Sequence, residues 1–195
     1  DANKTTATLL TTNNKTLGSI SWRDYGTAIK FVNSSTFVIA YHNYSSGTFA
    51  LIAGAIQSDN TITWGTPVNT NYSPSGYSRP RLYFFGSNRG ICYYLSIYAT
   101  GFVVNGTTIT VGPAEMIRTS SSSDSYMLYS IKQLATDTFV IVWKEQYYYI
   151  YCSVYSIGSD GSLTRSVYRY NVKSFSSTVV GGLSVGVLSP TSIII

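Results

Sequence analysis

The chain has 195 residues, of which 44% are hydrophobic, 15% aromatic and only 11% charged, and its formal net charge is +5. This apolar content excludes a disordered chain, and the Lys and Arg residues form no basic run, so we expect no nucleic-acid partner. Strand-forming Tyr and Thr and turn-forming Gly, Asn and Ser are abundant while helix formers are sparse, so the composition predicts an all-β protein.

The first predicted element is a short strand near the N-terminus. Asp1–Thr6 carries no charged and apolar leader, so a secreted form of the protein is expected to have lost its signal peptide already. Thr5–Thr12 (TTATLLTT) resembles the fourth strand of the units that follow. We therefore expect it to belong to an incomplete unit.

A first complete unit of four predicted strands comes next, at about Thr27–Val32, Thr36–Tyr41, Thr48–Ile56 and Thr61–Val68. The second strand, TFVIAY, is apolar on both faces, which is typical of a strand covered by a neighbouring sheet on each side. The fourth strand alternates more and is expected closer to solvent. Asp59-Asn60 favours a two-residue hairpin with positive φ at both positions.

The same pattern recurs along the chain. FVNSSTFVIAYHN (Phe31–Asn43) matches QLATDTFVIVWKE (Gln133–Glu145), and a shorter relative, FFGSNRGICYYL (Phe84–Leu95), lies between them. Later hairpins carry Asn105-Gly106 and Asp160-Gly161. If Thr36, Gly90, Thr138 and Ser192 are equivalent, the period is about 50 residues. The second unit is shorter by about eight residues between its second and third strands, which predicts a missing loop there.

These repeats define one repeat domain over residues 1–195, with units at about 20–70, 71–124 and 125–177 and a partial unit formed by 178–195 with 1–15. TFVIAYHNYSSGTFALIAGAIQSDNTITWGTPV (Thr36–Val68) resembles the tandem propeller-type repeats of secreted, cell-surface and viral proteins, most of which have no characterised function. The resemblance implies a β-propeller-like fold of about four blades of four-stranded antiparallel sheet. The terminal blade is expected to be incomplete, or shared between the termini or between chains.

The C-terminal segment SPTSIII (Ser189–Ile195) matches the first turn and second strand of a unit. Three explanations of this apolar end stay open. The four units close a small ring with an incomplete last blade, or the polypeptide continues beyond Ile195. In the third explanation Ile193, Ile194 and Ile195 form an assembly strand that pairs with another chain.

No catalytic or metal-binding pattern is present. The single histidine, His42, is expected at the rim of its unit, and a zinc site needs more His and Cys ligands than the chain has. Four carboxylates remain as candidates for the two catalytic groups of a glycosidase, but no motif marks any of them: Asp24, Glu115, Asp124 and Glu145. We expect neither an enzyme nor a cofactor.

Cys92 and Cys152 are predicted to be two buried free thiols rather than a disulfide. The uncharged stretch Ser174–Ile195 contains glycines, a proline and many serines, which argues against a membrane-spanning helix. Trp22, Trp64 and Trp143 are expected in the core, and Tyr147, Tyr149 and Tyr151 on one strand face, with Tyr148 on the other, as packing residues.

Six Asn-X-Ser/Thr sequons are the clearest modification signal, and all fall at predicted turns or termini: Asn3, Asn14, Asn33, Asn43, Asn71 and Asn105. Together these features predict an extracellular or cell-surface glycoprotein that is not catalytic. The first hypothesis is a structural subunit of a fibre, appendage or coat that self-associates by strand pairing. The alternative is a carbohydrate-binding or adhesion module with glycans as its partners.

Overall fold

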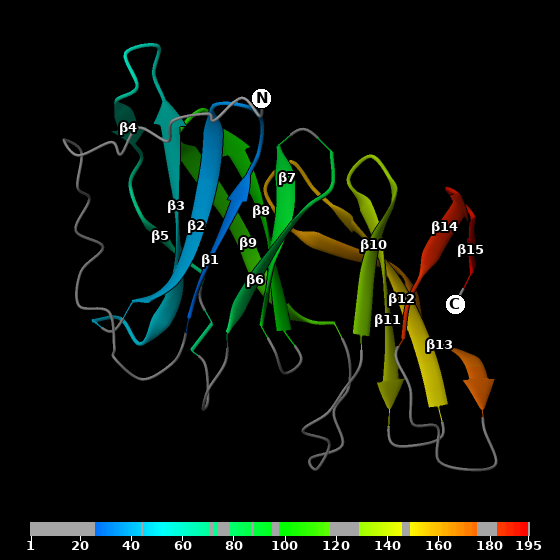
Figure 1. The fold of residues 1–195 in the computed structure, drawn as a ribbon. Helices are drawn as coiled ribbons and strands as arrows, with labels where there is room; N and C mark the ends of the chain where they lie inside the picture. Colours follow the sequence, from blue (N-terminus) through cyan, green and yellow to red (C-terminus); the bar gives the residue numbers. More distant parts are fainter. Residues whose placement is uncertain are drawn as a thin grey trace, which may run out of the picture.

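The computed structural model describes residues 26–43, 45–70, 72–73, 79–86, 88–94, 98–117, 129–145, 149–174 and 183–194 (Figure 1). Every regular element in these ranges is a β-strand, so the all-β prediction is confirmed. Within the same ranges no helix is long and apolar enough to cross a membrane. Trp22, predicted in the core, and the predicted N-terminal strand Thr5–Thr12 lie outside the described residues.

The strands form three antiparallel units and one terminal hairpin. Unit 1 contains β1 (Thr27–Phe31), β2 (Thr36–Asn43), β3 (Thr48–Ile56), β4 (Ile62–Trp64) and β5 (Val68–Asn69). Unit 2 contains β6 (Pro80–Phe84), β7 (Arg89–Tyr94), β8 (Tyr98–Asn105) and β9 (Thr108–Met116). Unit 3 contains β10 (Tyr129–Ala135), β11 (Thr138–Glu145), β12 (Tyr149–Ile157) and β13 (Leu163–Ser174). The terminal hairpin contains β14 (Gly186–Ser189) and β15 (Ser192–Ile194).

The units follow one another as an open series. In each unit the first four strands are hydrogen-bonded in chain order, so their connections are hairpins, and in unit 1 β5 also pairs with β3. Figure 1 shows unit 1 and the terminal hairpin at opposite ends, with units 2 and 3 between them. The described residues therefore form four sheets side by side and no closed ring.

Apolar layers hold the units together. We call the face of a unit that looks toward the next unit its forward face, and the opposite face its rear face. The forward face of unit 1 (Val38, Ala40, Phe49, Leu51, Ala53) packs on the rear face of unit 2 (Leu82, Cys92, Tyr94, Phe102, Val104, Ile109). A second layer joins units 2 and 3, and a third joins Val140, Val142 and Cys152 of unit 3 to Val185 and Ile193. The second strands of units 2 and 3 each contribute to two such layers, which explains their apolar residues on both faces. In unit 1, β2 contributes to one layer and, on its other face, to a buried cluster within the unit.

The predicted alignment of unit 2 with the other units is wrong by one residue. The backbone N–H groups of Ile56, Val104 and Ile157 donate to the carbonyls of Ser35, Asn88 and Asp137 at 2.7, 2.8 and 2.8 Å. These bonds make Arg89, and not Gly90, the equivalent of Thr36 and Thr138. Because a one-residue slip exchanges the two faces of a strand, the corrected register also explains why Cys92 faces unit 1.

The hairpins between third and fourth strands lie where the sequence predicts them, but their turn types differ. Ser58–Asn60 and Ser159–Gly161 are three-residue loops in which only the last residue has positive φ, 63° at Asn60 and 80° at Gly161. In unit 2, Asn105 pairs with Thr108, so Gly106-Thr107 forms the turn with φ of 60° at Gly106 alone. This is the pattern of a type II′ turn, and no hairpin here is type I′.

Two further expectations about the strands are wrong. The predicted fourth strand of unit 1 is split into β4 and β5 around Pro67, which has no N–H to donate to a ladder. The shorter length of unit 2 does not remove a loop, because β7 and β8 are separated by residues 95–97, much as β11 and β12 are by 146–148. The strands and the following turn both account for the shorter unit. β7 has 6 residues where β2 and β11 have 8, and only residues 106–107 separate β8 from β9, where residues 158–162 separate β12 from β13.

Candidate functional site

The polar residues that could have carried chemistry have structural roles. No group of three or more His, Cys, Asp and Glu side chains that could hold a metal ion exists among the described residues. His42, expected at a rim, is only 7% exposed and its ring lies edge-on to Phe49 at 5.7 Å. Burial lowers the pKa of His42, which favours a neutral imidazole packed in the core.

The described carboxylates mostly shape turns. Asp59 accepts hydrogen bonds from the Thr61 hydroxyl at 2.7 Å and from the Thr61 N–H at 3.0 Å, and these bonds lower its pKa. Asp160 is held in the same way by Ser162. Of the four carboxylates considered for a glycosidase pair, Asp24 and Asp124 lie outside the described residues, as does the side chain of Glu145. Only Glu115 of these four has a described side chain, so every possible pair among them includes a residue that the structure does not describe.

Glycines mark where one unit docks on the next. The tip of the β8–β9 hairpin lies on unit 1, where a Cβ added to Gly65 would overlap the carbonyl of Thr107. The tip of the β12–β13 hairpin lies on unit 2, where a Cβ on Gly101 or Gly112 would overlap the carbonyl of Gly161. The hairpin between third and fourth strands of one unit thus rests on glycine backbone of the unit before it.

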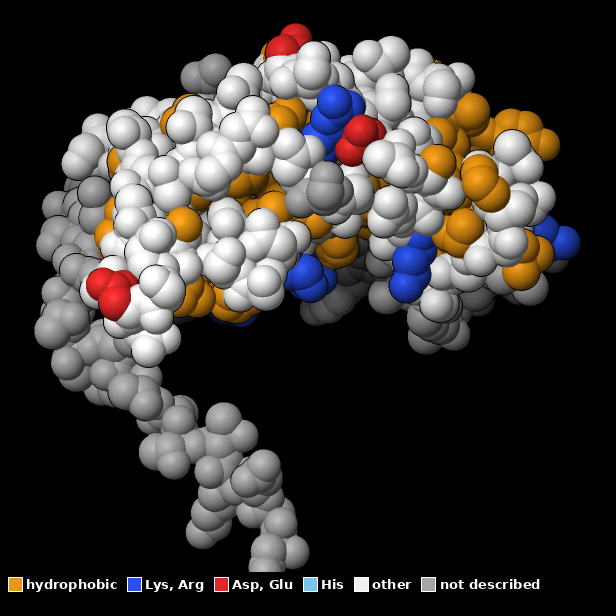
Figure 2. All heavy atoms as spheres, turned by 90° about the horizontal axis from the view of Figure 1, so that it is seen from above, with side chains coloured by type: hydrophobic (Ala, Val, Ile, Leu, Met, Phe, Trp, Pro, Cys, Tyr) orange, Lys and Arg blue, Asp and Glu red, His pale blue; other side chains and the backbone are white. Residues whose placement is uncertain are grey.

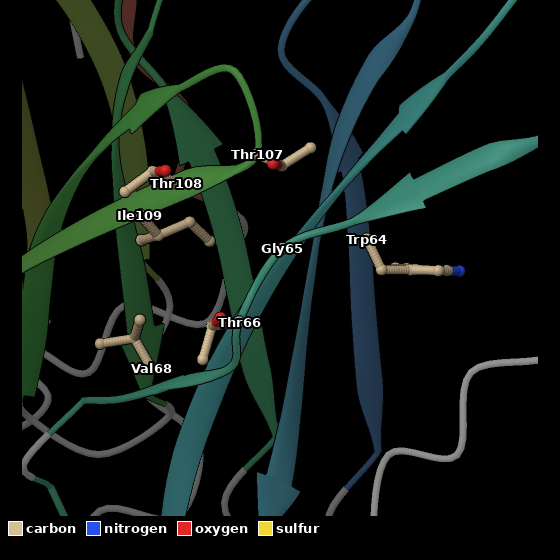
Figure 3. A pocket seen from close by; sticks show the side chains of 7 residues that line it. All are labelled: Trp64, Gly65, Thr66, Val68, Thr107, Thr108 and Ile109. Atoms are coloured by element: carbon tan, nitrogen blue, oxygen red, sulfur yellow. The ribbon is translucent and has the colours of Figure 1, made fainter.

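A small pocket of about 260 Å³ lies at the first of these junctions (Figure 3). Thr107, Thr108 and Ile109 of the docking hairpin face Gly65–Val68 across it. Figure 3 shows the ring of Trp64 pointing away from these residues, and this ring instead contacts Phe37 edge-on at 5.5 Å. Trp64 therefore cannot act as a platform for a sugar in this pocket.

A larger and more apolar pocket, of about 450 Å³, lies between unit 3 and the terminal hairpin. Its floor is the forward face of unit 3 (Leu134, Val140, Cys152, Val154, Val167, Tyr170), and its wall is the β14–β15 hairpin (Pro190, Thr191, Ile193). At both earlier junctions, the hairpin between third and fourth strands of the next unit fills this position. Among the described residues, the terminal hairpin supplies only the first two strands of a unit.

The edge of β15 is open beside this pocket. In the part of the chain that the structure describes, β15 pairs with β14 alone, whereas β2, β7 and β11 each pair with two strands. Large hydrophobic side chains are exposed on the neighbouring strands: Val167, Tyr168, Tyr170, Val187 and Leu188. Figure 2 shows hydrophobic side chains gathered at this end of the molecule, where charged side chains are few. We call the β15 edge and the apolar pocket together the acceptor site.

The sequence signal for this site was the apolar strand at Ile193–Ile195. The structure places Ile193 in β15 with its side chain in the layer against unit 3, while the side chains of Ile194 and Ile195 are not described. The pocket itself had no signal in the sequence. Cys152 and Tyr170 are paired across β12 and β13, but they meet Pro190 and Ile193 only through the packing of the terminal hairpin on unit 3.

Three of the six sequons fall on described residues. Asn33 and Asn105 are exposed and lie at hairpin turns, whereas Asn43 is half-buried. The Asn33 carboxamide oxygen accepts bonds from the N–H groups of Ser35 and Thr36 at 2.9 and 2.8 Å, which leaves its amide nitrogen outside the turn. Asn3, Asn14 and Asn71 lie outside the described residues.

Both cysteines are buried free thiols, as predicted. Burial raises the pKa of Cys92 to about 12 and also raises the pKa of Cys152, so both stay protonated near neutral pH. Trp143 is fully buried in the core. Tyr149 and Tyr151 share one face of β12 and stack at 5.9 Å, whereas Tyr147 and Tyr148 lie outside the described residues.

No protein-family model matches the chain, and no curated protein matches it. Among solved structures, it is similar to the crystal structure of the Saccharomyces cerevisiae Sqt1, with 11% sequence identity and a TM-score of 0.45. The match covers 73% of this chain and 34% of Sqt1, so the chain spans about a third of the length of that protein. A likeness of this strength carries no conclusion about function.

Proposed function

We propose that this protein is a non-catalytic, extracellular structural subunit whose units are propeller-type blades and which assembles into a fibre, appendage or coat by β-strand pairing. The single observation that carries the proposal is the acceptor site. An open strand edge is a template for another strand, and natural proteins usually protect such edges with charges, prolines or a covering segment.

The chemistry of the acceptor site supports strand addition in particular. Backbone groups along β15 offer hydrogen bonds, and the apolar floor of Val140, Val154 and Val167 offers burial to the side chains of an added strand. Each apolar side chain removed from water there contributes roughly 1.5–3 kcal/mol. The scarcity of charge on β14 and β15 also removes the like-charge repulsion that normally opposes edge pairing.

The exposed sequons at Asn33 and Asn105 support the extracellular part of the proposal. A carbohydrate-binding module is less well supported, because Trp64 points away from the polar pocket and the Tyr-rich segments differ from unit to unit. We therefore favour assembly over sugar binding as the function.

The test is the molar mass of the protein as a function of concentration, measured by light scattering after size exclusion. We expect the native protein to form species larger than a monomer. Ile193→Asp places a carboxylate in the wall of the acceptor site and is expected to abolish assembly. Ser184→Asp introduces the same charge at an exposed position just before β14 and serves as the control. A native protein that stays monomeric at every concentration overturns the proposal.

A further inference from the structure

The acceptor site is shaped for a short chain segment and not for a second folded sheet. Unit 3 lies beneath the terminal hairpin and continues beneath the open side of β15, since Cys152, Val154 and Val167 belong to β12 and β13. If two copies paired their β15 edges about a two-fold axis perpendicular to the sheet, each unit 3 would occupy the same space beneath the shared sheet. A symmetric dimer of this kind is therefore excluded.

The two inner junctions show what kind of segment fits. Ile109 of β9 is 5% exposed and belongs to the layer between units 1 and 2. Leu163 of β13 is 9% exposed, belongs to the layer between units 2 and 3, and lies over Gly101. Both residues take the second position of a short fourth-strand pattern, Thr-Ile-Thr-Val at 108–111 and Ser-Leu-Thr-Arg at 162–165. The acceptor site lacks a residue of this kind.

The N-terminal segment carries the same pattern. Ser19-Ile20-Ser21-Trp22 matches Thr61-Ile62-Thr63-Trp64 of unit 1, with Ile20 at the position of Ile109 and Leu163. Thr5–Thr12 and the turn-forming Asn13-Asn14-Lys15 precede it in the same order in which β3 and Ser58–Asn60 precede β4, with Thr16-Leu17-Gly18 as three additional residues between the turn and the last strand. In this alignment Thr5–Thr12 takes the place of a third strand, and not of the fourth strand that it resembles by itself, and Ser19–Trp22 takes the place of the fourth. These are the two strands that follow the first two strands in each complete unit.

We propose that Thr5–Trp22 of a second copy of this chain occupies the acceptor site, with Ile20 in the apolar pocket, so that copies join head to tail. This inference rests on the proposed function, because it names the donor of the strands. The completed sheet has four antiparallel strands, like those of units 2 and 3.

The donor is a second copy because of the short link to β1. Only Arg23–Gly26 separates Trp22 from Thr27, and five residue steps span no more than roughly 18 Å. A linker of that length keeps a strand at Ser19–Trp22 near unit 1 of its own chain. The acceptor site of the same chain lies at the other end of the series, beyond units 2 and 3 (Figure 1). Sheets packed face to face are about 10 Å apart, so three such spacings exceed the link.

A head-to-tail contact is heterologous, so a joined pair keeps one unused donor on one copy and one unused acceptor on the other. Assembly therefore continues into a filament, or into a ring where the rotation between copies closes. This property gives the proposal a sharp test. A donor-defective chain and an acceptor-defective chain have one intact donor and one intact acceptor between them, so a mixture of the two can form a dimer but nothing larger.

The experiment mixes two full-length variants. Ile20→Asp is the donor-defective chain, with Trp22→Asp as a second form, and Ile193→Asp is the acceptor-defective chain. Each alone is expected to be monomeric, and an equimolar mixture is expected to form a one-to-one heterodimer and nothing larger. Ser21→Asp is the matched control, since its equivalent Thr63 is exposed, and it is expected to assemble like the native chain.

The outcomes separate this inference from the proposed function. If Ile20→Asp and Trp22→Asp assemble like the native chain, another segment fills the acceptor site and only the present inference fails. If the native chain is monomeric and Ile20→Asp lowers its stability, Ile20 packs within its own chain and both proposals fail. Formation of the heterodimer shows that the variants are folded, which removes misfolding as a reason for their monomeric state.

Discussion

At the scale of single residues, glycine is the residue type on which the packing of one unit against the next depends most. Gly161 has a φ of 80°, and a Cβ there would lie 2.7 Å from the Gly112 nitrogen and 2.9 Å from the Gly101 oxygen. Gly106 sits in the corresponding hairpin of unit 2 with a φ of 60° and has no atom within 4 Å of an added Cβ. The two glycines share the backbone requirement and differ in the contact, so they form a matched pair.

Gly161→Ala is expected to destabilise the protein more than Gly106→Ala. The change at Gly106 costs only the left-handed backbone, about 1 kcal/mol. The change at Gly161 has the same backbone cost, and its methyl group also overlaps unit 2. Overpacking of this kind lowers the free energy of unfolding by about a further 1–3 kcal/mol. Urea unfolding of both variants measures the difference. Equal losses of stability would mean that the hairpin tip does not rest on unit 2 as tightly as the structure shows.

At the scale of elements, the junctions combine apolar packing with one charged contact. Arg89 at the start of β7 forms an ion pair with Asp137 in the β10–β11 turn, with 2.8 Å between Nη1 and Oδ2. The same Nη1 donates to the carbonyl of Ile157 at 2.9 Å. Arg89 thus ties unit 2 to two segments of unit 3, and it has the same place in its unit as Thr36 and Thr138 in theirs.

The ion pair between Arg89 and Asp137 is expected to contribute up to about 1 kcal/mol, because both side chains are roughly three-quarters buried and salt screens them only in part. A double-mutant cycle with Arg89→Met and Asp137→Asn measures it, since Asn tolerates the φ of 59° at position 137. The coupling energy should fall in high salt. Strictly additive losses of stability would show that the pair does not contribute.

The strands were largely predictable from the sequence, and the junctions were not. The predicted bounds of β3 agree with the structure, and the apolar second strands indicated sheets on both sides. The register of unit 2 was off by one because Gly90 looks like a strand start when it is the partner of Phe102. In unit 1 Phe37 covers Gly54, and in unit 2 Phe102 covers Gly90, so the aromatic residue and the glycine have exchanged strands.

Only the strand of the acceptor site could be predicted from the sequence, and its pocket could not. Alternation and turn residues are local properties, and they indicated that Ile193–Ile195 forms a second strand. The pocket depends on which side chains of β12 and β13 lie beneath that strand, and this follows from the packing of unit 3 on the terminal hairpin. The prediction for His42 was wrong for the same reason, because its burial and its contact with Phe49 depend on packing, whereas the sequence alone puts it near a strand end.

At the scale of the whole molecule, stability is expected to be highest in the middle of the series and lowest at its ends. The inner layers bury Phe49, Ile91, Trp143 and their neighbours almost completely. The ends carry exposed apolar residues, Ile29 and Phe31 on β1 and Leu188 on β14. In a stack of repeats each unit is stabilised by its neighbours, so the end units lack part of this stabilisation until a partner arrives.

Assembly should therefore change hydrogen exchange in one place above all. In the monomer, the amides of β15 that point away from β14 are open to solvent, because β14 is the only strand described beside it. On assembly these amides are expected to exchange slower by roughly tenfold or more, since each acquires a partner on the added strand. The amides of β7, sandwiched between units 1 and 3, provide the internal reference and should exchange at the same rate at low and high protein concentration. If β15 stays fast in the assembled protein while β1 or β13 becomes protected, the copies pair through a different edge, and the polar groups of β15 remain exposed to water in the assembled form.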